Sequence, residues 1–204
     1  MLREVATGAE AVVPSGAVEI LHVLAGGGTL WAANDAVELV PGRSVVIPSG
    51  VSFRYSGDAM LLAATVPGHG DALGVTDRPP DIVVVAPDGS GVRPLARTPD
   101  EGASLAEFEL PPGATSKAVR HYELEEFWFF VAGTGEMWLE GGDPVAVGPG
   151  ASLTIPARVA FQFRSLGDEP LRIVGLTLPA WPLDRPESEV IQTDVAGPWR
   201  ATVG

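Results

Sequence analysis

The chain has 204 residues, no cysteine and a net charge of −13, and 46% of its residues are hydrophobic. The absence of cysteine excludes disulfides, thiolate metal sites and a cysteine nucleophile, and it is consistent with a cytoplasmic location. The negative charge repels phosphate backbones and anionic lipids, so neither nucleic acid nor membrane is expected as a partner.

The N-terminal segment MLREVATGAEAVV has no basic stretch followed by an apolar run, so no signal peptide is expected. No apolar stretch reaches the ~18 residues of a membrane span. The 19 prolines and 25 glycines interrupt the chain often. Between them lie short runs of β-branched and aromatic residues, a pattern that predicts an all-β chain of many short strands.

In the first half, EILHVL from Glu19, SVVIP at 44–48 and LLAATV at 61–66 are predicted strands, and the glycines at 26–28 predict a tight turn. The polar stretch GHGDALGVTDRPPD at 68–81 is the expected linker. DIVVVAP follows it at once and is a candidate strand of either half.

The second half repeats the first. GRSVVIPSGVSFRY at 42–55 aligns without a gap with GASLTIPARVAFQF at 150–163, and EILHVLAGGG matches EFWFFVAGTG. Two tandem barrels are therefore predicted, at residues 1–80 and 81–182. Residues 183–204 form a tail, whose Trp199 is expected to pack back onto a barrel.

These repeated blocks resemble the two motifs of the cupin superfamily. In the second half, the spacing of Gly113, His121, Glu126 and Gly133 fits the first motif, and Gly150 and Pro156 fit the second. In the first half the same frame is kept by Glu19, Gly26, Gly42, Pro48 and Gly50. The resemblance implies a bicupin, with two tandem double-stranded β-helix (jelly-roll) barrels.

The resemblance also identifies what is missing. Metal-binding cupins hold iron, manganese, nickel or zinc with three histidines and one glutamate. Here Val119 and Phe161 replace two of those histidines, Arg158 replaces the glycine of the second motif, and His121 and Glu126 remain. In the first half Phe53 replaces the last histidine, and Val12 and Pro14 fall at the paired histidines.

Three interpretations of His121 and Glu126 follow. They hold a divalent metal with help from Glu123, Glu125 or water, although two protein ligands fall short of the usual three. Alternatively they form a metal-free acid/base pair, in which the carboxylate orients the imidazole, as in the metal-free sugar epimerases of the superfamily. In the third interpretation they are an inert, hydrogen-bonded remnant. The second interpretation, the metal-free acid/base pair, is favoured, and it requires no cofactor.

Strand alternation adds a candidate pocket. If Glu126 points into the barrel, so do Trp128 and Phe130, while Phe161 and Phe163 share one face. These four aromatic side chains are predicted either to line a substrate pocket or to fill the core. Arg120 and Arg158 are candidates for binding an anionic group of the substrate at the barrel mouth, or they are solvated.

Two histidines are weaker candidates. His22 has the opposite strand parity to Glu19, so it is expected outside the first barrel at a surface or interface, and His69 lies in a flexible turn. The first barrel, with Phe53 and Tyr55 on one face and Glu19 as its remaining polar residue, is predicted to be structural.

The expected function is therefore an enzyme acting on a small apolar or aromatic metabolite by proton transfer, of the isomerase, cyclase or lyase kind, with His121 and Glu126 as catalytic residues. One alternative is a non-catalytic binding or structural bicupin. Another is a metal-dependent dioxygenase or decarboxylase with an incomplete ligand set. A monomer or a homodimer is expected, with Phe127 and Phe129 facing outward as a candidate interface.

Overall fold

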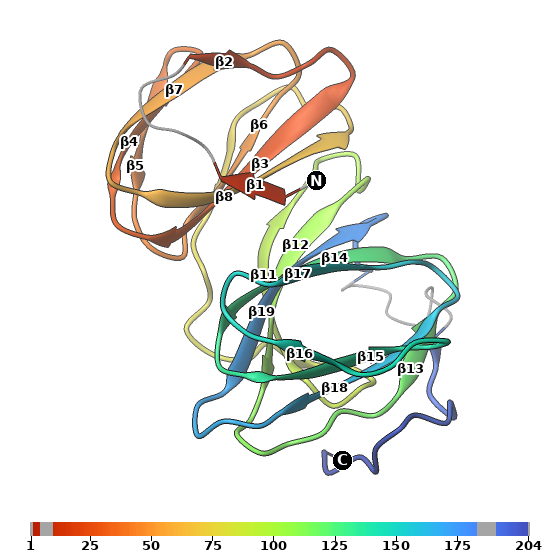
Figure 1. Ribbon diagram of the computed structural model, residues 1–204. Coiled ribbons are helices and arrows are strands. Elements are labelled where there is room, and N and C mark those ends of the chain that lie inside the picture. The colour runs from red at the N-terminus through yellow and green to blue at the C-terminus, as the bar shows by residue number, and fades with distance from the viewer. Residues whose placement is uncertain (1, 5–9, 183–190, 204) are drawn as a thin grey trace. The chain divides into compact units, whose positions relative to one another are not determined.

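The computed structural model describes residues 2–4, 10–182 and 191–203 (Figure 1). Within these ranges the regular elements are all β-strands, so the all-β prediction is confirmed. The chain divides into two compact units, Met1–Pro79 with Leu95–Ser104 and Pro80–Pro94 with Leu105–Gly204. In the described part of the chain no helix is long and apolar enough to cross a membrane.

The first unit contains a five-stranded sheet of order β1-β8-β3-β6-β9 and a four-stranded sheet of order β2-β7-β4-β5. Its core contains side chains from both sheets, such as Leu21 and Leu30. The strands are β1 (Leu2–Glu4), β2 (Ala11–Val12), β3 (Ala17–Ala25), β4 (Gly28–Ala32), β5 (Asp35–Leu39), β6 (Ser44–Ile47), β7 (Ser52–Gly57), β8 (Met60–Pro67) and β9 (Gly74–Thr76).

The second unit contains a five-stranded sheet of order β16-β15-β18-β13-β20, and a six-stranded sheet of order β10-β11-β12-β19-β14-β17 is built mainly from it. Its core is rich in aromatic rings from both sheets. The strands are β10 (Val84–Val85), β11 (Gly91–Arg97), β12 (Ser104–Leu110), β13 (Val119–His121), β14 (Glu125–Ala132), β15 (Gly135–Leu139), β16 (Val145–Val147), β17 (Ser152–Ile155), β18 (Ala160–Ser165), β19 (Leu171–Leu178) and β20 (Ile191–Gln192).

The sequence repeat is also a repeat of strand register. In the first unit Glu19 of β3 lies opposite Ile47 of β6 and Thr65 of β8. In the second unit Glu126 of β14 lies opposite Ile155 of β17 and Thr177 of β19. The turns predicted after these strands form at Gly26 and Gly133, with φ of 69° and 75°, a region that favours glycine.

The strand register corrects the predicted counterparts of the paired histidines. Val119 pairs with Phe161 in the second unit, and Ala11 pairs with Phe53 in the first. The carbonyl of His121 accepts the Arg158 amide, just as the carbonyl of Val13 accepts the Gly50 amide. The counterpart of His121 is therefore Val13 rather than Pro14. The motif spacing, counted from Glu19, gives Pro14 because it does not allow for one extra residue between Val13 and Glu19 in the first unit.

Three segments differ in detail from the sequence prediction. The expected linker contains β9, which pairs with β6, and DIVVVAP contributes β10, which pairs with β11. Residues 95–104 group with the first unit, where the Asp100 carboxylate accepts the His69 amide.

The described part of the tail packs on the second unit. It adds β20 beside β13, and the buried Gln162 side chain bonds both the amide and the carbonyl of Trp199. The guanidinium of Arg164 lies 4.5 Å from the centre of the Trp199 ring, a cation–π contact. Trp199 therefore packs on the second unit through Gln162 and Arg164.

Candidate functional site

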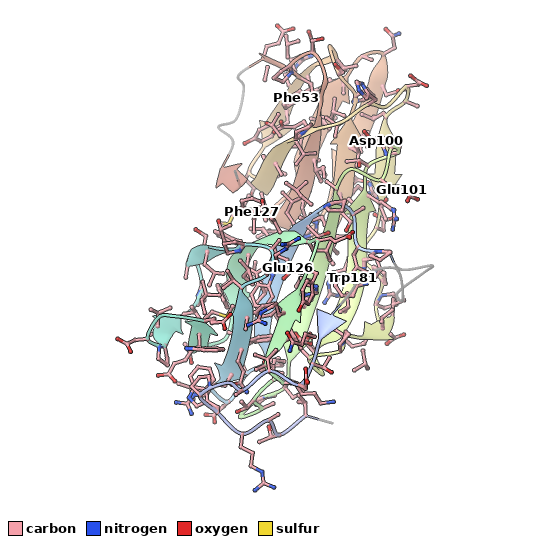
Figure 2. All side chains as sticks on the ribbon, turned by 90° about the vertical axis from the view of Figure 1, so that its right-hand side faces the viewer. Phe53, Asp100, Glu101, Glu126, Phe127 and Trp181 are labelled. Carbon is pink, nitrogen blue, oxygen red and sulfur yellow. The ribbon has the colours of Figure 1, made fainter. Side chains whose placement is uncertain are left out.

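A cavity of about 10 Å³ lies inside the second unit, which is about the space that one water molecule needs. Its polar lining consists of Asp88, His121 and Glu126. The remaining lining is apolar and mostly aromatic: Ala86, Pro87, Phe108, Val119, Trp128, Phe161 and Trp181. Figure 2 labels Glu126 and Trp181, two of the residues around it.

His121 is positioned by the strands on both sides of β13. Residue Arg120 of this strand pairs with β18, and both Arg120 and His121 pair with β20. Alternation turns Val119 and His121 into the barrel, where the imidazole is only 5% exposed. Its ring stacks on Phe161 with 5.7 Å between centres and meets Trp181 edge-on at 5.4 Å. The histidine is thus held between two aromatic rings.

Glu126 enters the same cavity from β14 and is 1% exposed. Its Oε2 accepts a hydrogen bond of 2.9 Å from Trp128 Nε1. Its Oε1 lies 3.9 Å from His121 Nε2, which is longer than a hydrogen bond. The predicted pair is therefore brought together in the cavity, with 3.9 Å and no direct hydrogen bond between these two atoms.

Asp88 is a third ionisable residue of the cavity and was not among the predicted site residues. It lies in the turn between β10 and β11, is 5% exposed, and accepts two hydrogen bonds at Oδ1, from Ser90 N at 2.8 Å and Ser90 Oγ at 2.7 Å. Burial raises the pKa of the Asp88 carboxyl above its usual range, against the opposing effects of the Ser90 hydrogen bonds and of the charge on His121.

This raised pKa predicts that Asp88→Asn gains stability relative to the wild type as the pH rises. Between the ordinary Asp pKa and the raised one, the folded chain keeps a proton that the unfolded chain has released, so the free energy of unfolding falls as pH rises. Asparagine has no such proton and keeps an oxygen for Ser90. We expect its Tm to exceed that of the wild type by about 2–4 °C at neutral pH, the shift that roughly 1 kcal/mol produces.

Thermal unfolding at several pH values measures this gap. A constant difference between Asp88→Asn and the wild type from acidic to neutral pH would contradict a raised Asp88 pKa. Asp71→Asn, at an exposed aspartate of the first unit, is the control for removing one negative charge.

The four aromatic candidates are all buried, as alternation predicted, but they do not share one role. Trp128 and Phe161 line the cavity. Phe130 and Phe163 are less than 2% exposed and belong to the hydrophobic core, where both contact Trp128 edge-on. Two of the four residues thus line the cavity, and the other two fill the core. Phe108 and Trp181 complete the aromatic lining and were not predicted.

Neither arginine candidate lines the cavity. Arg120 points to the opposite side of β13 from His121 and forms an ion pair of 2.7 Å with Glu140 and a hydrogen bond to Gln192. Arg158 is exposed and has a left-handed φ of 69°, where the first unit has Gly50 at 73°. The proposed anion-binding role at the barrel mouth therefore has no support from these positions.

The residues present do not fit a cupin metal centre. The described ranges bring together no group of three His, Cys, Asp or Glu side chains that could hold a metal ion. Val119 and Phe161 face each other at two of the ligand positions, and the candidate helpers Glu123 and Glu125 are exposed. A divalent metal held by His121 and Glu126 would lack a third protein ligand from this part of the chain.

The other two histidines lie outside this site. His22 is on the opposite face of β3 from the core residues Leu21 and Val23, yet it is only 3% exposed, and its Nδ1 lies 2.9 Å from Ser44 Oγ. It is therefore not a surface residue. His69 is exposed. In the first unit the buried Glu19 accepts a hydrogen bond from Thr65.

Known proteins with similar sequences or structures agree with this fold. Residues 106–177 match the cupin domain family. The uncharacterized protein MJ1618 of Methanocaldococcus jannaschii is 28% identical over 89 residues, which cover 44% of this chain and 69% of that protein.

Two solved structures match both units. One is a deletion mutant of Bacillus subtilis oxalate decarboxylase, which matches with a TM-score of 0.65 and 12% identity. The match covers 95% of this chain and 70% of the decarboxylase chain. A cupin 2 conserved barrel domain protein from Leptotrichia buccalis has a TM-score of 0.59 and 14% identity, with 87% and 81% covered. At such identities the likeness concerns the fold. Residues 106–177 thus match the cupin domain family, and the fold of the chain is similar to that of these cupin structures.

Proposed function

We propose that the second unit catalyses proton transfer on a small, largely apolar or aromatic metabolite, in an isomerase, cyclase or lyase reaction. The observation that carries the proposal is the buried contact of His121 and Glu126 at a cavity that also contains Asp88. Burying three ionisable groups in a barrel core is costly. The first barrel avoids the cost of burying an imidazole at this position, because it has Val13 where the second barrel has His121.

In this proposal each ionisable group has a role. His121 is the base, because the imidazole titrates near neutral pH and its Nε2 is directed towards Glu126. Glu126 orients the ring and stabilises its positive charge when a proton arrives, while Trp128 fixes the carboxylate through its Oε2. Asp88, whose raised pKa favours the protonated carboxyl, can return a proton to the product. A base and an acid at one cavity suit isomerisation and elimination.

The cavity size sets a condition on this function. Only about one water fits into the present space, so a metabolite can place a single small group beside His121 unless the lining moves. Trp181 is the half-buried member of the aromatic lining, which makes it the wall residue with the fewest packing constraints.

Deuterium incorporation tests the proposal. The protein is incubated in heavy water with a panel of small amines, alcohols, ketones and aromatic acids, and carbon-bound deuterium is measured by mass spectrometry. We expect incorporation into at least one compound above the rate in buffer, and equal incorporation with Glu125→Gln, whose exposed side chain lies outside the site. Incorporation at the buffer rate throughout the panel would contradict catalysis by proton transfer.

The small cavity favours one alternative, a non-catalytic bicupin that binds a small ligand or has a structural role. This candidate predicts no turnover of any compound and an unchanged structure when His121 is replaced. A metal-dependent dioxygenase or decarboxylase, which the likeness to oxalate decarboxylase would suggest, has less support, because the residues that the structure describes offer an incomplete ligand set.

A further inference from the structure

We propose that Trp181 is the movable wall of the cavity: rotation of its indole side chain opens the His121 site to solvent and makes room for the apolar or aromatic ring of a metabolite. This inference rests on the proposed function, and it identifies the residue that decides which substrates reach the base.

Trp181 is the aromatic wall that lies outside the strands. The other aromatic lining residues, Phe108, Trp128 and Phe161, are on β12, β14 and β18. Each of these strands runs between two neighbours in its sheet, and the three side chains are at most 6% exposed. Trp181, labelled in Figure 2, lies beyond Leu178, the last residue of β19, and is half-buried. Solvent therefore already reaches part of this side chain.

Rotation of the indole leaves the backbone in place. The Trp181 amide donates a hydrogen bond of 3.2 Å to Thr177 Oγ1. Thr177 is 1% exposed and pairs with Glu126 of the neighbouring strand, so this anchor belongs to the packed part of the barrel. Because a side chain rotates without breaking backbone hydrogen bonds, the cavity can open while the barrel stays folded.

The Trp181 ring lies where the ring of a substrate has to lie. It meets the His121 imidazole edge-on, with 5.4 Å between ring centres. The indole is far larger than the present cavity of about 10 Å³, so its rotation out of the barrel leaves space for an aromatic ring beside the base. Displacement of Trp128 instead would break its hydrogen bond to Glu126.

The turn between β10 and β11 is the other part of the lining that reaches solvent, through Pro87. Backbone hydrogen bonds hold this turn at two points. The Ala86 amide bonds the Ser90 carbonyl at 2.8 Å. The Lys117 amide bonds the Asp88 carbonyl, also at 2.8 Å. Opening the cavity on this side would break such bonds, whereas rotation of the indole breaks none of them.

The three histidines of the chain provide the test. Diethyl pyrocarbonate acylates neutral imidazole, and peptide mass spectrometry gives a separate modification rate for each histidine. The exposed His69 gives the rate of an accessible imidazole. His22, which is 3% exposed in the first unit, is the control for a buried histidine without a movable wall. The purified full chain is modified at about pH 8, where an ordinary imidazole is neutral, in a series of urea concentrations below the unfolding transition.

In the wild type, we expect His121 to react more slowly than His69, at a rate that urea leaves nearly unchanged. Rotation of one side chain exposes little surface, and the urea dependence of an opening reaction scales with the surface exposed. The His22 rate is expected to rise with urea, since the structure around it has to unfold. A His121 rate that rises as steeply as the His22 rate would overturn the proposal, and this comparison needs no variant.

Replacement of Trp181 by alanine is expected to raise the His121 modification rate about 10- to 100-fold, because a minor open conformer of the wild type is populated at roughly 1–10%. The His22 rate stays unchanged, and circular dichroism shows that the variant is folded. Trp199→Ala, at the half-buried tryptophan of the tail, is the matched control. Its hydrogen bonds with Gln162 use the backbone, so they remain, and His121 keeps the wild-type rate. A folded Trp181→Ala variant with the wild-type His121 rate would contradict the assigned role.

Failure of this inference differs from failure of the proposed function. If His121 modification follows the expected pattern but no compound incorporates deuterium, the movable wall remains and catalysis is removed. Incorporation by a protein whose His121 reacts only on unfolding would leave catalysis and remove Trp181 as the entrance. Where both hold, Trp181→Ala should also incorporate deuterium into compounds of the panel that are bulkier than those accepted by the wild type.

Discussion

Replacement of His121 by glutamine is expected to lower the rate of deuterium incorporation about 100- to 10,000-fold, the usual contribution of a general base. Glutamine is similar in size and forms hydrogen bonds, but it cannot take up a proton. The imidazole is buried against Phe161 and Trp181 and lies 3.9 Å from Glu126. No other described histidine reaches the cavity.

The control for this variant is His69→Gln, at the exposed histidine of the first unit. His69 contributes its backbone amide to Asp100, a bond that glutamine preserves, so wild-type rates are expected. Circular dichroism and thermal unfolding show whether His121→Gln is folded. A folded His121→Gln variant that retains the wild-type rate would remove the histidine from the mechanism and favour Asp88 and Glu126 as the proton-transferring pair.

The frame of both barrels could be predicted because it is local. Glycine and proline fix turns and strand ends within a few residues, and alternation assigns Glu126, Trp128 and Phe130 to one face. The same rule also predicts that Arg120, between two inward residues, points outward. The prediction that Arg120 binds the substrate relied on the attraction of a guanidinium for anions and neglected strand parity.

The rest of the site depends on chain topology. Asp88 is 33 residues from His121 in the sequence, and only the path of β10 and β11 places its turn at the cavity. Trp181 reaches the cavity from beyond the end of β19, where its amide bonds Thr177 Oγ1. In the sequence, PDGS indicates a turn and nothing more, and no spacing relates these residues to His121.

Substitution of Gly175 by alanine is expected to destabilise the second unit by about 1–3 kcal/mol, the usual cost of adding a methyl group to a packed core. Gly175 of β19 lies opposite Trp128. A Cβ atom there would clash with the Phe108 ring and lie 3.1 Å from Trp128 Cδ1. These two rings stack with 5.5 Å between centres, so relief of the clash has to move one of them.

The measurement for Gly175→Ala is the free energy of unfolding in urea, together with tryptophan fluorescence. Gly148→Ala is the matched control, because the nearest atoms to its Cβ would be at an ordinary 3.7 Å. Unchanged stability in Gly175→Ala would show that the cavity lining yields easily to added volume. Since Trp128 Nε1 holds Glu126 Oε2, a shift of this ring also displaces the carboxylate from His121. The folded fraction of Gly175→Ala should therefore lose proton-transfer activity, although no ionisable residue has been changed.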